Sequence, residues 1–346
     1  MKSPATSDVL DLARLTAWLD ERGLGEGEVR AEPITVGASN LIFDLRRGPH
    51  HWVLRRPPTV PVSPTAHDMV REFRVLSALE GTPVPHPTPL ALCEDEEVIG
   101  ARFYVMEFVD GFCPRDPLPP PFDRSTQARR ELGFRLVDAL ADLATVDWEA
   151  HGLEGFGHPD GYLDRQVDRW NGQLERYRTR DIPHLDDVAA WLRGNVPSMG
   201  EPGIIHGDYQ LINTLFAHPS WGGARPRPRL AAIVDWEQST IGDPLVDLGW
   251  LLAGWHHAGE EPSFTAAYLA DRHGFATRDE LAERYEHRTG RSLEHLSWYR
   301  VLALFKLACV LEGHYAKFAR GESDHPIHER FGELVLQLAR QASELI

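Results

Sequence analysis

Two short motifs in the middle of the chain constrain its fold and chemistry more than any other feature. The first is His206-Gly-Asp208-Tyr-Gln-Leu-Ile-Asn213, and the second is Ile233-Val-Asp235-Trp-Glu237. A carboxylate five residues before an asparagine, followed by a second carboxylate after an apolar run, is an arrangement for phosphoryl transfer. The first aspartate accepts a hydroxyl proton, while the asparagine and the second aspartate hold magnesium against a nucleoside triphosphate. Such catalysis depends on positioning and charge neutralisation.

Length and composition indicate a globular protein with no membrane partner. The 346 residues suffice for one large or two medium domains, and 42% of them are hydrophobic. The longest apolar stretches, Leu248–Trp255 and Val301–Leu311, are too short or too interrupted to span a bilayer. No secretory signal is visible, and Cys93, Cys113 and Cys309 are widely spaced and odd in number. We therefore expect free thiols in a reducing compartment, and a cytoplasmic location.

The charge balance excludes one class of partner. A net charge of −16 argues against a general nucleic-acid-binding protein. Most of the excess acidity lies beyond residue 106. This distribution fits either a field that attracts a cationic substrate or a solvated acidic surface.

Hydrophobic periodicity predicts a β-rich first part of the chain. A helix is expected over residues 8–22, with Gly23 as its stop. Further along, the pattern predicts strands at 34–36, 41–45, 51–54, 90–93 and 102–108, and a helix at 67–79. The Asp110-Gly111 turn and the proline-rich stretch 114–121 then indicate a boundary.

Beyond this boundary the pattern is mostly helical. Helices are expected at 125–147, 161–178, 184–194, 243–257, 263–273, 278–289, 293–319 and 327–345. Two short strands, 214–216 and 230–234, interrupt them, with 224–229 as a hairpin tip. We therefore predict an α+β chain with a small β-rich lobe (1–106), a hinge (107–112) and a larger helical lobe (113–346).

The motifs and this organisation together resemble the aminoglycoside phosphotransferase and choline kinase family, relatives of the protein kinases. The most specific segments are Ile204–Phe216 and Ile233–Leu248. Finer details are similar to phosphotransferases that also occur fused to acyl-CoA dehydrogenases: Trp52–Pro58, Arg71–Arg74, Phe103–Glu107 and Arg284–Gly290. The resemblance implies a bilobal protein-kinase-like fold and transfer of phosphate from ATP, or alternatively GTP, to a hydroxyl of a small molecule.

The resemblance also implies a role for each motif residue. Asp208 matches the catalytic aspartate that orients and deprotonates the substrate hydroxyl. Asn213 and Asp235 match the two protein ligands of magnesium. His206 matches a residue that braces the catalytic loop, and Asp247 matches a buried carboxylate that fixes this loop from the following helix. Taken alone, either loop aspartate would read equally well as a turn or N-cap residue.

In the small lobe, one expected residue is replaced. Relatives place a lysine on the third strand to hold the α- and β-phosphates, whereas here the pattern reads Val-Leu-Arg55. Arg55 keeps the charge but presents a planar fork, and Glu72 on the following helix is its expected partner. Arg56 is the competing candidate, although strand alternation points it to the other face.

Two further segments are candidates for nucleotide binding. The turn at Ser39 and Asn40 either lays backbone N–H groups against phosphates or is an ordinary hairpin turn. Glu107 and Val109 match a hinge whose backbone binds the adenine edge. Gln210 stands where kinases often carry a cation for the γ-phosphate, and a neutral amide contributes no charge there.

Three interpretations of the function remain open at this stage. The first is a kinase for a hydroxylated metabolite, including a hydroxyacyl thioester, which the arginines between residues 165 and 180 would suit. The second is a kinase for aminoglycoside-like sugars, which acidic residues would suit. The third is a nucleotide-binding pseudokinase that regulates a partner. The intact Asp208, Asn213 and Asp235 favour an enzyme.

Overall fold

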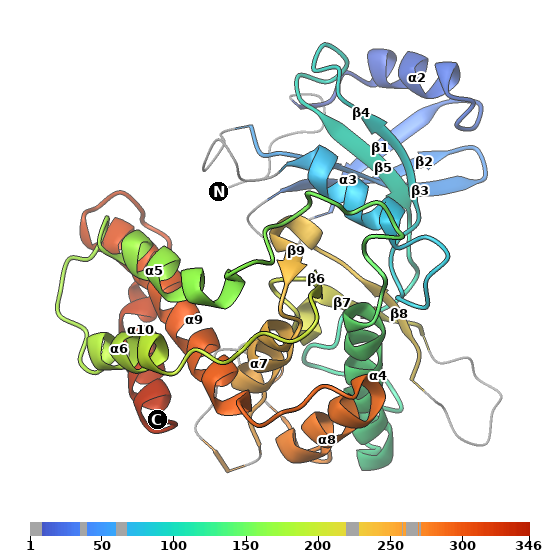
Figure 1. Cartoon of the computed structure of the whole chain (residues 1–346). Helices are drawn as coiled ribbons and strands as arrows, with labels where there is room; N and C mark the ends of the chain where they lie inside the picture. The colour runs from blue at the N-terminus through green and yellow to red at the C-terminus, as the bar shows by residue number, and fades with distance from the viewer. Residues whose placement is uncertain are drawn as a thin grey trace.

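The computed structural model describes residues 9–34, 40–59, 68–218, 228–257, 259–260, 269 and 271–346. These residues form two lobes, a smaller one built on a five-stranded sheet and a larger one that is mainly helical (Figure 1). The predicted bilobal α+β architecture is therefore confirmed.

The small lobe is an antiparallel sheet with a helix on each face. Its strands lie in the order β1-β2-β3-β5-β4. Their bounds are β1 Val29–Pro33, β2 Leu41–Arg47, β3 His50–Arg56, β4 Pro89–Cys93 and β5 Phe103–Glu107. Helix α2 (Leu12–Glu21) packs with Leu54 on one face, whereas helix α3 (Met69–Ala78) lies on the face of Val53. Because strand side chains alternate, Arg55 shares the α3 face with Val53.

The large lobe is mainly helical, and several of its helices pack on one long, largely buried helix. The helices are α4 Thr126–Ala144, α5 Tyr162–Leu174, α6 Leu185–Gly194, α7 Leu245–Gly254, α8 Arg278–Thr289, α9 Leu296–Ala319 and α10 Pro326–Ser343. Helices α7 and α10 both pack on α9. Two short antiparallel pairs face the small lobe: β6 (Gly203–Ile205) with β9 (Thr240–Gly242), and β7 (Thr214–Phe216) with β8 (Leu230–Ile233). The loops between these strands carry the two motifs.

Several predicted elements differ from the structure. The strand expected at residues 34–36 falls largely outside the described residues, and the structure adds a strand that was not predicted, Val29–Pro33, where only Val29 is buried. The strands β6 and β9 were not predicted, because three residues are too few to show a period. The expected hairpin tip at 224–229 and the expected helix at 263–273 fall largely outside the described residues.

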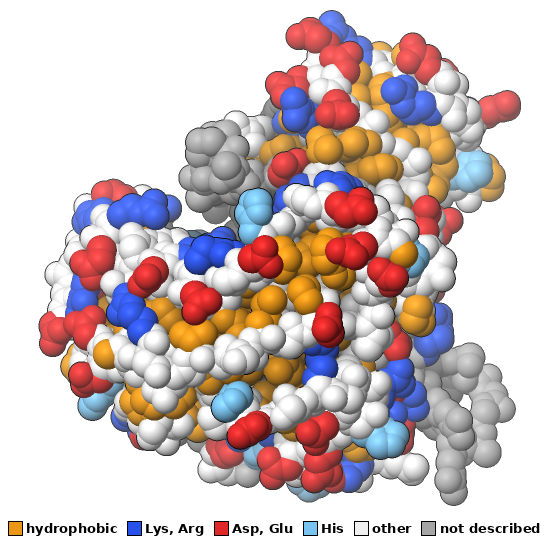
Figure 2. Space-filling model, in the orientation of Figure 1, with side chains coloured by type: hydrophobic (Ala, Val, Ile, Leu, Met, Phe, Trp, Pro, Cys, Tyr) orange, Lys and Arg blue, Asp and Glu red, His pale blue; other side chains and the backbone are white. Residues whose placement is uncertain are grey.

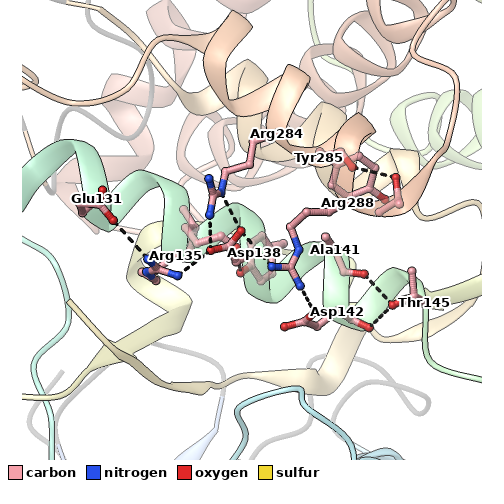
Figure 3. A network of polar contacts seen from close by, with 12 residues as sticks. Glu131, Arg135, Asp138, Ala141, Asp142, Thr145, Arg284, Tyr285 and Arg288 are labelled. Carbon is pink, nitrogen blue, oxygen red and sulfur yellow. Dashed lines mark hydrogen bonds and ion pairs between the residues drawn. The ribbon is translucent and has the colours of Figure 1, made fainter. Parts of the chain in front are cut away.

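A cluster of arginines and carboxylates joins α4 to α8 (Figure 3). Asp138 of α4 is buried, and its two oxygens accept hydrogen bonds from Arg284 at 2.7 and 2.9 Å and from Arg135 at 3.0 Å. Arg288 reaches both Asp138 and Asp142. A buried carboxylate needs such partners to remain charged. The Arg284–Gly290 segment therefore has a structural role in holding α8 on α4.

Charged side chains of both signs are interspersed over the face shown in Figure 2. This distribution is typical of a solvated surface. Within the part of the chain that the structure describes, no helix is long and apolar enough to cross a membrane.

Candidate active site

A buried carboxylate, that of Asp247, holds the loop between β6 and β7 in place. Asp247, in the first turn of α7, accepts hydrogen bonds from the backbone N–H groups of His206 at 2.6 Å and Gly207 at 2.9 Å. Burial raises the pKa of Asp247 to about 7, and these two hydrogen bonds act in the opposite direction. Asp247 thus fixes the backbone immediately before Asp208.

His206 is fully buried and bridges the two motif loops. Its Nε2 lies 3.0 Å from the carbonyl oxygen of Val234, and its Nδ1 accepts a hydrogen bond from the N–H of Asp208 at 3.2 Å. One neutral tautomer satisfies both contacts. Burial lowers the pKa of His206 to about 4, so the ring is neutral at pH 7. His206 therefore positions the loops and does not change its protonation state near neutrality.

Asp208 is held by two amide side chains from its own loop. Asn213 donates to its Oδ2 at 2.8 Å, and Gln210 donates to its Oδ1 at 2.6 Å. Burial raises the pKa of Asp208 to about 6, while Lys306 and the two amides oppose this rise. The carboxylate is thus mostly ionised at neutral pH but basic enough to accept a proton.

Glycine is required before this aspartate for a steric reason. Gly207 adopts φ = +85°, and a Cβ atom there would lie 2.5 Å from the carbonyl oxygen of Gln238. The two motif loops are therefore in contact at this point, with no room for a side chain.

The second motif meets the small lobe through Arg55. Its Nη2 lies 2.6 Å from Oδ1 of Asp235, and its Nε lies 2.8 Å from Oε2 of Glu72 on α3. Arg55 is only 5% exposed and Glu72 1% exposed. Although burial of the guanidinium acts against its charge, the neighbouring carboxylates hold the pKa of Arg55 above its ordinary value. The pairing of Arg55 with Glu72 is the one expected from the sequence.

Other contacts complete this cluster. Asp235 has a left-handed backbone, φ = +70°, which is a strained conformation for a residue other than glycine. Tyr104 donates to Glu72 at 3.1 Å, and burial together with nearby carboxylates raises the pKa of Glu72 to about 7, against the effect of Arg55. Arg56 points to the opposite face of β3, where it donates to the backbone oxygens of Val9 and Ile99.

The remaining nucleotide-binding candidates are Ser39 and Asn40, which precede β2 in the sequence, and Glu107 and Val109 at the end of β5 and beyond it. Asn40 donates through Nδ2 to Glu237 at 2.9 Å, whereas Ser39 lies outside the described residues. Glu107 ends β5, and its N–H donates to Thr88 at 2.9 Å. Val109 follows in the connection to the large lobe and is half-buried.

A cavity of about 260 Å³ lies beside both motif loops. Its wall includes Gly207 from the first loop, Glu237 from the second and Lys306 from α9. Two arginines, Arg71 of α3 and Arg169 of α5, also line it.

Sequence reasoning gave no role to three residues at this site: Glu237, Lys306 and Tyr104. For Lys306 a signal was present, because the chain has only three lysines and this one interrupts the apolar stretch Val301–Leu311. Tyr104 is the cross-strand partner of Arg55, so both side chains lie on the same face of the sheet. Nothing local in the sequence identifies Glu72 as the hydrogen-bond acceptor of Tyr104.

The fold and this geometry define a class. The buried pair of Arg55 and Glu72 in the small lobe contacts Asp235 of the large lobe. The neighbouring loop carries the pair of Asp208 and Asn213. This arrangement is that of a small-molecule phosphotransferase with a protein-kinase-like fold. The chain belongs to the phosphotransferase enzyme family, whose model matches residues 30–284.

Known proteins similar to this chain fall into two groups. The Pongo abelii and Homo sapiens proteins named acyl-CoA dehydrogenase family member 11 are 33% and 32% identical to it over 97% of its length. The chain spans only 43% of the length of each. A Ralstonia eutropha protein of known structure, provisionally described as an aminoglycoside phosphotransferase, is 31% identical with a TM-score of 0.81, covering 97% of this chain and 98% of that one. The GDP complex of aminoglycoside 2'-phosphotransferase-IIIa shares the fold at 15% identity, with a TM-score of 0.63 and coverage of 96% and 99%.

Proposed function

We propose that this chain is an ATP- and magnesium-dependent kinase that transfers the γ-phosphate to a hydroxyl group of a small molecule. The observation that carries the proposal is the contact of Arg55 with both Glu72 and Asp235. This contact brings a phosphate-binding cation of the small lobe to the second motif, next to the loop of Asp208. Proteins of the same fold have been solved with GDP and with ADP, which supports nucleotide use.

In this proposal Asp208 is the general base. Its ionised carboxylate orients the acceptor hydroxyl and receives the proton as the acceptor oxygen attacks the γ-phosphorus. The bond between that phosphorus and the β,γ-bridging oxygen breaks, and the diphosphate leaves. His206 and Asp247 hold the loop, since both contact its backbone.

The donor groups near Asp208 fit a magnesium ion. Asn213 donates through Nδ2 to the backbone oxygen and to Oδ2 of Asp208, and its Oδ1 accepts no hydrogen bond from the described residues. Asp235 receives Arg55 on Oδ1 only. The described residues contain no group of three or more His, Cys, Asp or Glu side chains suited to a metal, but magnesium takes few protein ligands and keeps phosphate oxygens and water. When bound, magnesium would neutralise charge on the phosphates.

Arg55, steadied by Glu72, would hold the α- and β-phosphates. The backbone at Ser39 and Asn40 would face the same phosphates, and the backbone of Glu107 and Val109 would bind the adenine edge. We further propose lobe boundaries at 1–106 and 113–346, with 107–112 as the hinge. The end of β5 at Glu107 supports this division.

Two acceptor types follow from the relatives. A hydroxylated metabolite such as a hydroxyacyl thioester is supported by the similarity to acyl-CoA dehydrogenase family members 11 over 97% of this chain. An aminoglycoside-like sugar is supported by the Ralstonia eutropha protein. The observations above do not favour a pseudokinase, because Asp208, Asn213 and Asp235 are all present, Asn213 donates to Asp208, and Asp235 contacts Arg55.

The test is a nucleotide-turnover assay with ATP and GTP across hydroxylated metabolites, their thioesters and aminoglycosides. Asp208→Asn should lower kcat at least ~10²-fold with unchanged affinity for Mg-ATP, because it removes only the base. Asp181→Asn makes the same carboxyl-to-amide change at an exposed position and serves as the control. A wild-type protein that binds Mg-ATP but phosphorylates nothing would support the pseudokinase, and full activity of Asp208→Asn would exclude this base.

A further inference from the structure

The cavity beside the motif loops is positively charged although the chain as a whole is strongly acidic. Three cations line it, Arg71, Arg169 and Lys306, against the single carboxylate of Glu237. That carboxylate is already engaged, since Asn40 donates to it and Arg55 lies 3.6 Å away. A concave site lined by one sign of charge focuses the field on its ligand.

Lys306 is buried, and the loss of hydration of its ammonium group costs free energy. It is 9% exposed on α9, and its ammonium group lies 4.4 Å from the ring centroid of Trp250 and 5.3 Å from that of Trp170. Burial lowers the pKa of Lys306 to about 8, while Asp208 and Asp247 oppose this shift. The side chain is therefore still mainly charged at neutral pH.

The hydrogen bonds of Lys306 place it next to the reacting centre. Its Nζ donates to the carbonyl oxygen of Gly207 at 2.7 Å and to Oε1 of Gln238 at 3.3 Å. An ammonium group has three donors, and among the described residues only these two accept from it. No carboxylate in the described part of the chain lies within ion-pair distance of Lys306, and the same holds for Arg169, whose guanidinium lies 5.1 Å from the ring centroid of Trp170. Both cations thus retain capacity for an anionic ligand.

The third cation is already used for the fold. Arg71 donates to the backbone oxygens of Ser239 and Phe156, so it joins α3 to the wall of the cavity. We therefore assign recognition to Lys306 and Arg169. The size of the cavity also limits the ligand, since about 260 Å³ is below the range of roughly 300–1,000 Å³ for drug-sized ligands.

We propose that this cavity binds an anionic oxygen group of the phosphate acceptor, a carboxylate or a phosphate, through Lys306 at its floor and Arg169 at its edge. This inference rests on the proposed kinase function and specifies its substrate class. The acceptor is then a small hydroxylated anion whose hydroxyl reaches Asp208 while its charged end contacts Lys306. A polycationic sugar is excluded from the same cavity by charge.

Lys306 could act on catalysis without binding the acceptor, and the experiment must separate these two roles. Its charge also offsets those of Asp208 and Asp247, so a purely electrostatic role would affect every acceptor equally. The design therefore uses acceptors that share one carbon skeleton: short hydroxyalkanoates, their neutral amides and the corresponding amino alcohols. Hydroxyalkyl phosphates form a fourth arm, which distinguishes a phosphate-binding from a carboxylate-binding cavity.

For the wild type we expect kcat/KM to be highest for one of the anionic acceptors and lowest for the amino alcohol. Lys306→Met should lower kcat/KM for the anionic acceptor about 10- to 100-fold, the worth of a hydrogen bond to a charged group. The neutral amide should lose several-fold less than the anion, because it loses only the effect of Lys306 on Asp208 and its loop, so the preference for the anion narrows. Lys306→Arg should restore part of it. Lys317→Met, on the exposed end of the same helix, is the matched control.

Equal losses for all acceptors in Lys306→Met would overturn the proposal, as would a wild type that prefers the amide or the amine. The wild-type comparison needs no variant, so it holds even if Lys306→Met fails to fold. Calorimetric binding of the unreactive alkanoate separates the two proposals. Binding to the wild type but not to Lys306→Met, without turnover of any acceptor in this series or in the wider assay above, supports the anion site and refutes the kinase. Turnover of neutral acceptors without alkanoate binding refutes the anion site alone.

Discussion

Replacing Arg55 by methionine would leave Glu72 buried without its cation. Removing one partner of a buried ion pair costs about 3–5 kcal/mol. With an unfolding entropy of about 2.1 cal/mol/K per residue over 346 residues, this cost lowers Tm by about 4 to 7 °C. The double variant Arg55→Met/Glu72→Gln should recover part of the loss, because the amide carries no charge and still accepts the hydrogen bond from Tyr104. Thermal unfolding followed by circular dichroism measures both.

The pH dependence gives a second, independent readout of the same pair. Burial raises the pKa of Glu72 to about 7 with Arg55 present, and loss of Arg55 raises it further. A carboxyl group whose pKa is raised on folding binds more protons in the folded state, so stability increases as pH falls. The stability gap between Arg55→Met and the wild type should therefore be widest in alkaline solution and narrow as the pH falls towards about 7. A gap that is absent, or that is the same in the Glu72→Gln background, would refute the buried-pair argument.

Two shorter predictions concern the loop of Asp208. Because burial raises its pKa to about 6, kcat/KM should fall about tenfold per pH unit below that value as the base takes up its proton; a flat pH–rate profile across this range would contradict the assignment. Gly207→Ala should abolish most activity, since its Cβ would lie 2.5 Å from the carbonyl oxygen of Gln238. Gly321→Ala, at φ = +73° with nothing within 4 Å, should cost only about 1–2 kcal/mol of stability and leave kcat intact.

The sequence was most informative where local chemistry determines structure. Helix α8 was predicted at its observed bounds from its helical pattern. In the structure, Thr277 and Glu280 form a capping box at its start, and Gly290 ends it in a left-handed conformation. Strand alternation correctly separated Arg55 from Arg56, because the two faces of β3 contact different structures. The bilobal organisation followed from the change of period along the chain.

Tertiary packing decided what the sequence could not reveal. The edge strand β1 exposes most of its residues, so the apolar run after it gave the stronger signal. The cavity draws Arg71 from α3, Arg169 from α5 and Lys306 from α9. These residues are far apart in the chain, and no local pattern relates them. The net charge of the whole chain therefore gave no indication that this cavity is positively charged.

The arginine at position 55 has a consequence for chemical proteomics. An amine-reactive nucleotide analogue needs a lysine beside the phosphates, because a guanidinium stays protonated and does not react. The chain contains only Lys2, Lys306 and Lys317, and Lys306 lies in the wall of the neighbouring cavity. If Arg55 holds the phosphates as proposed, an amine-reactive nucleotide analogue should label a peptide from α9, where Lys306 lies, and not one from β3.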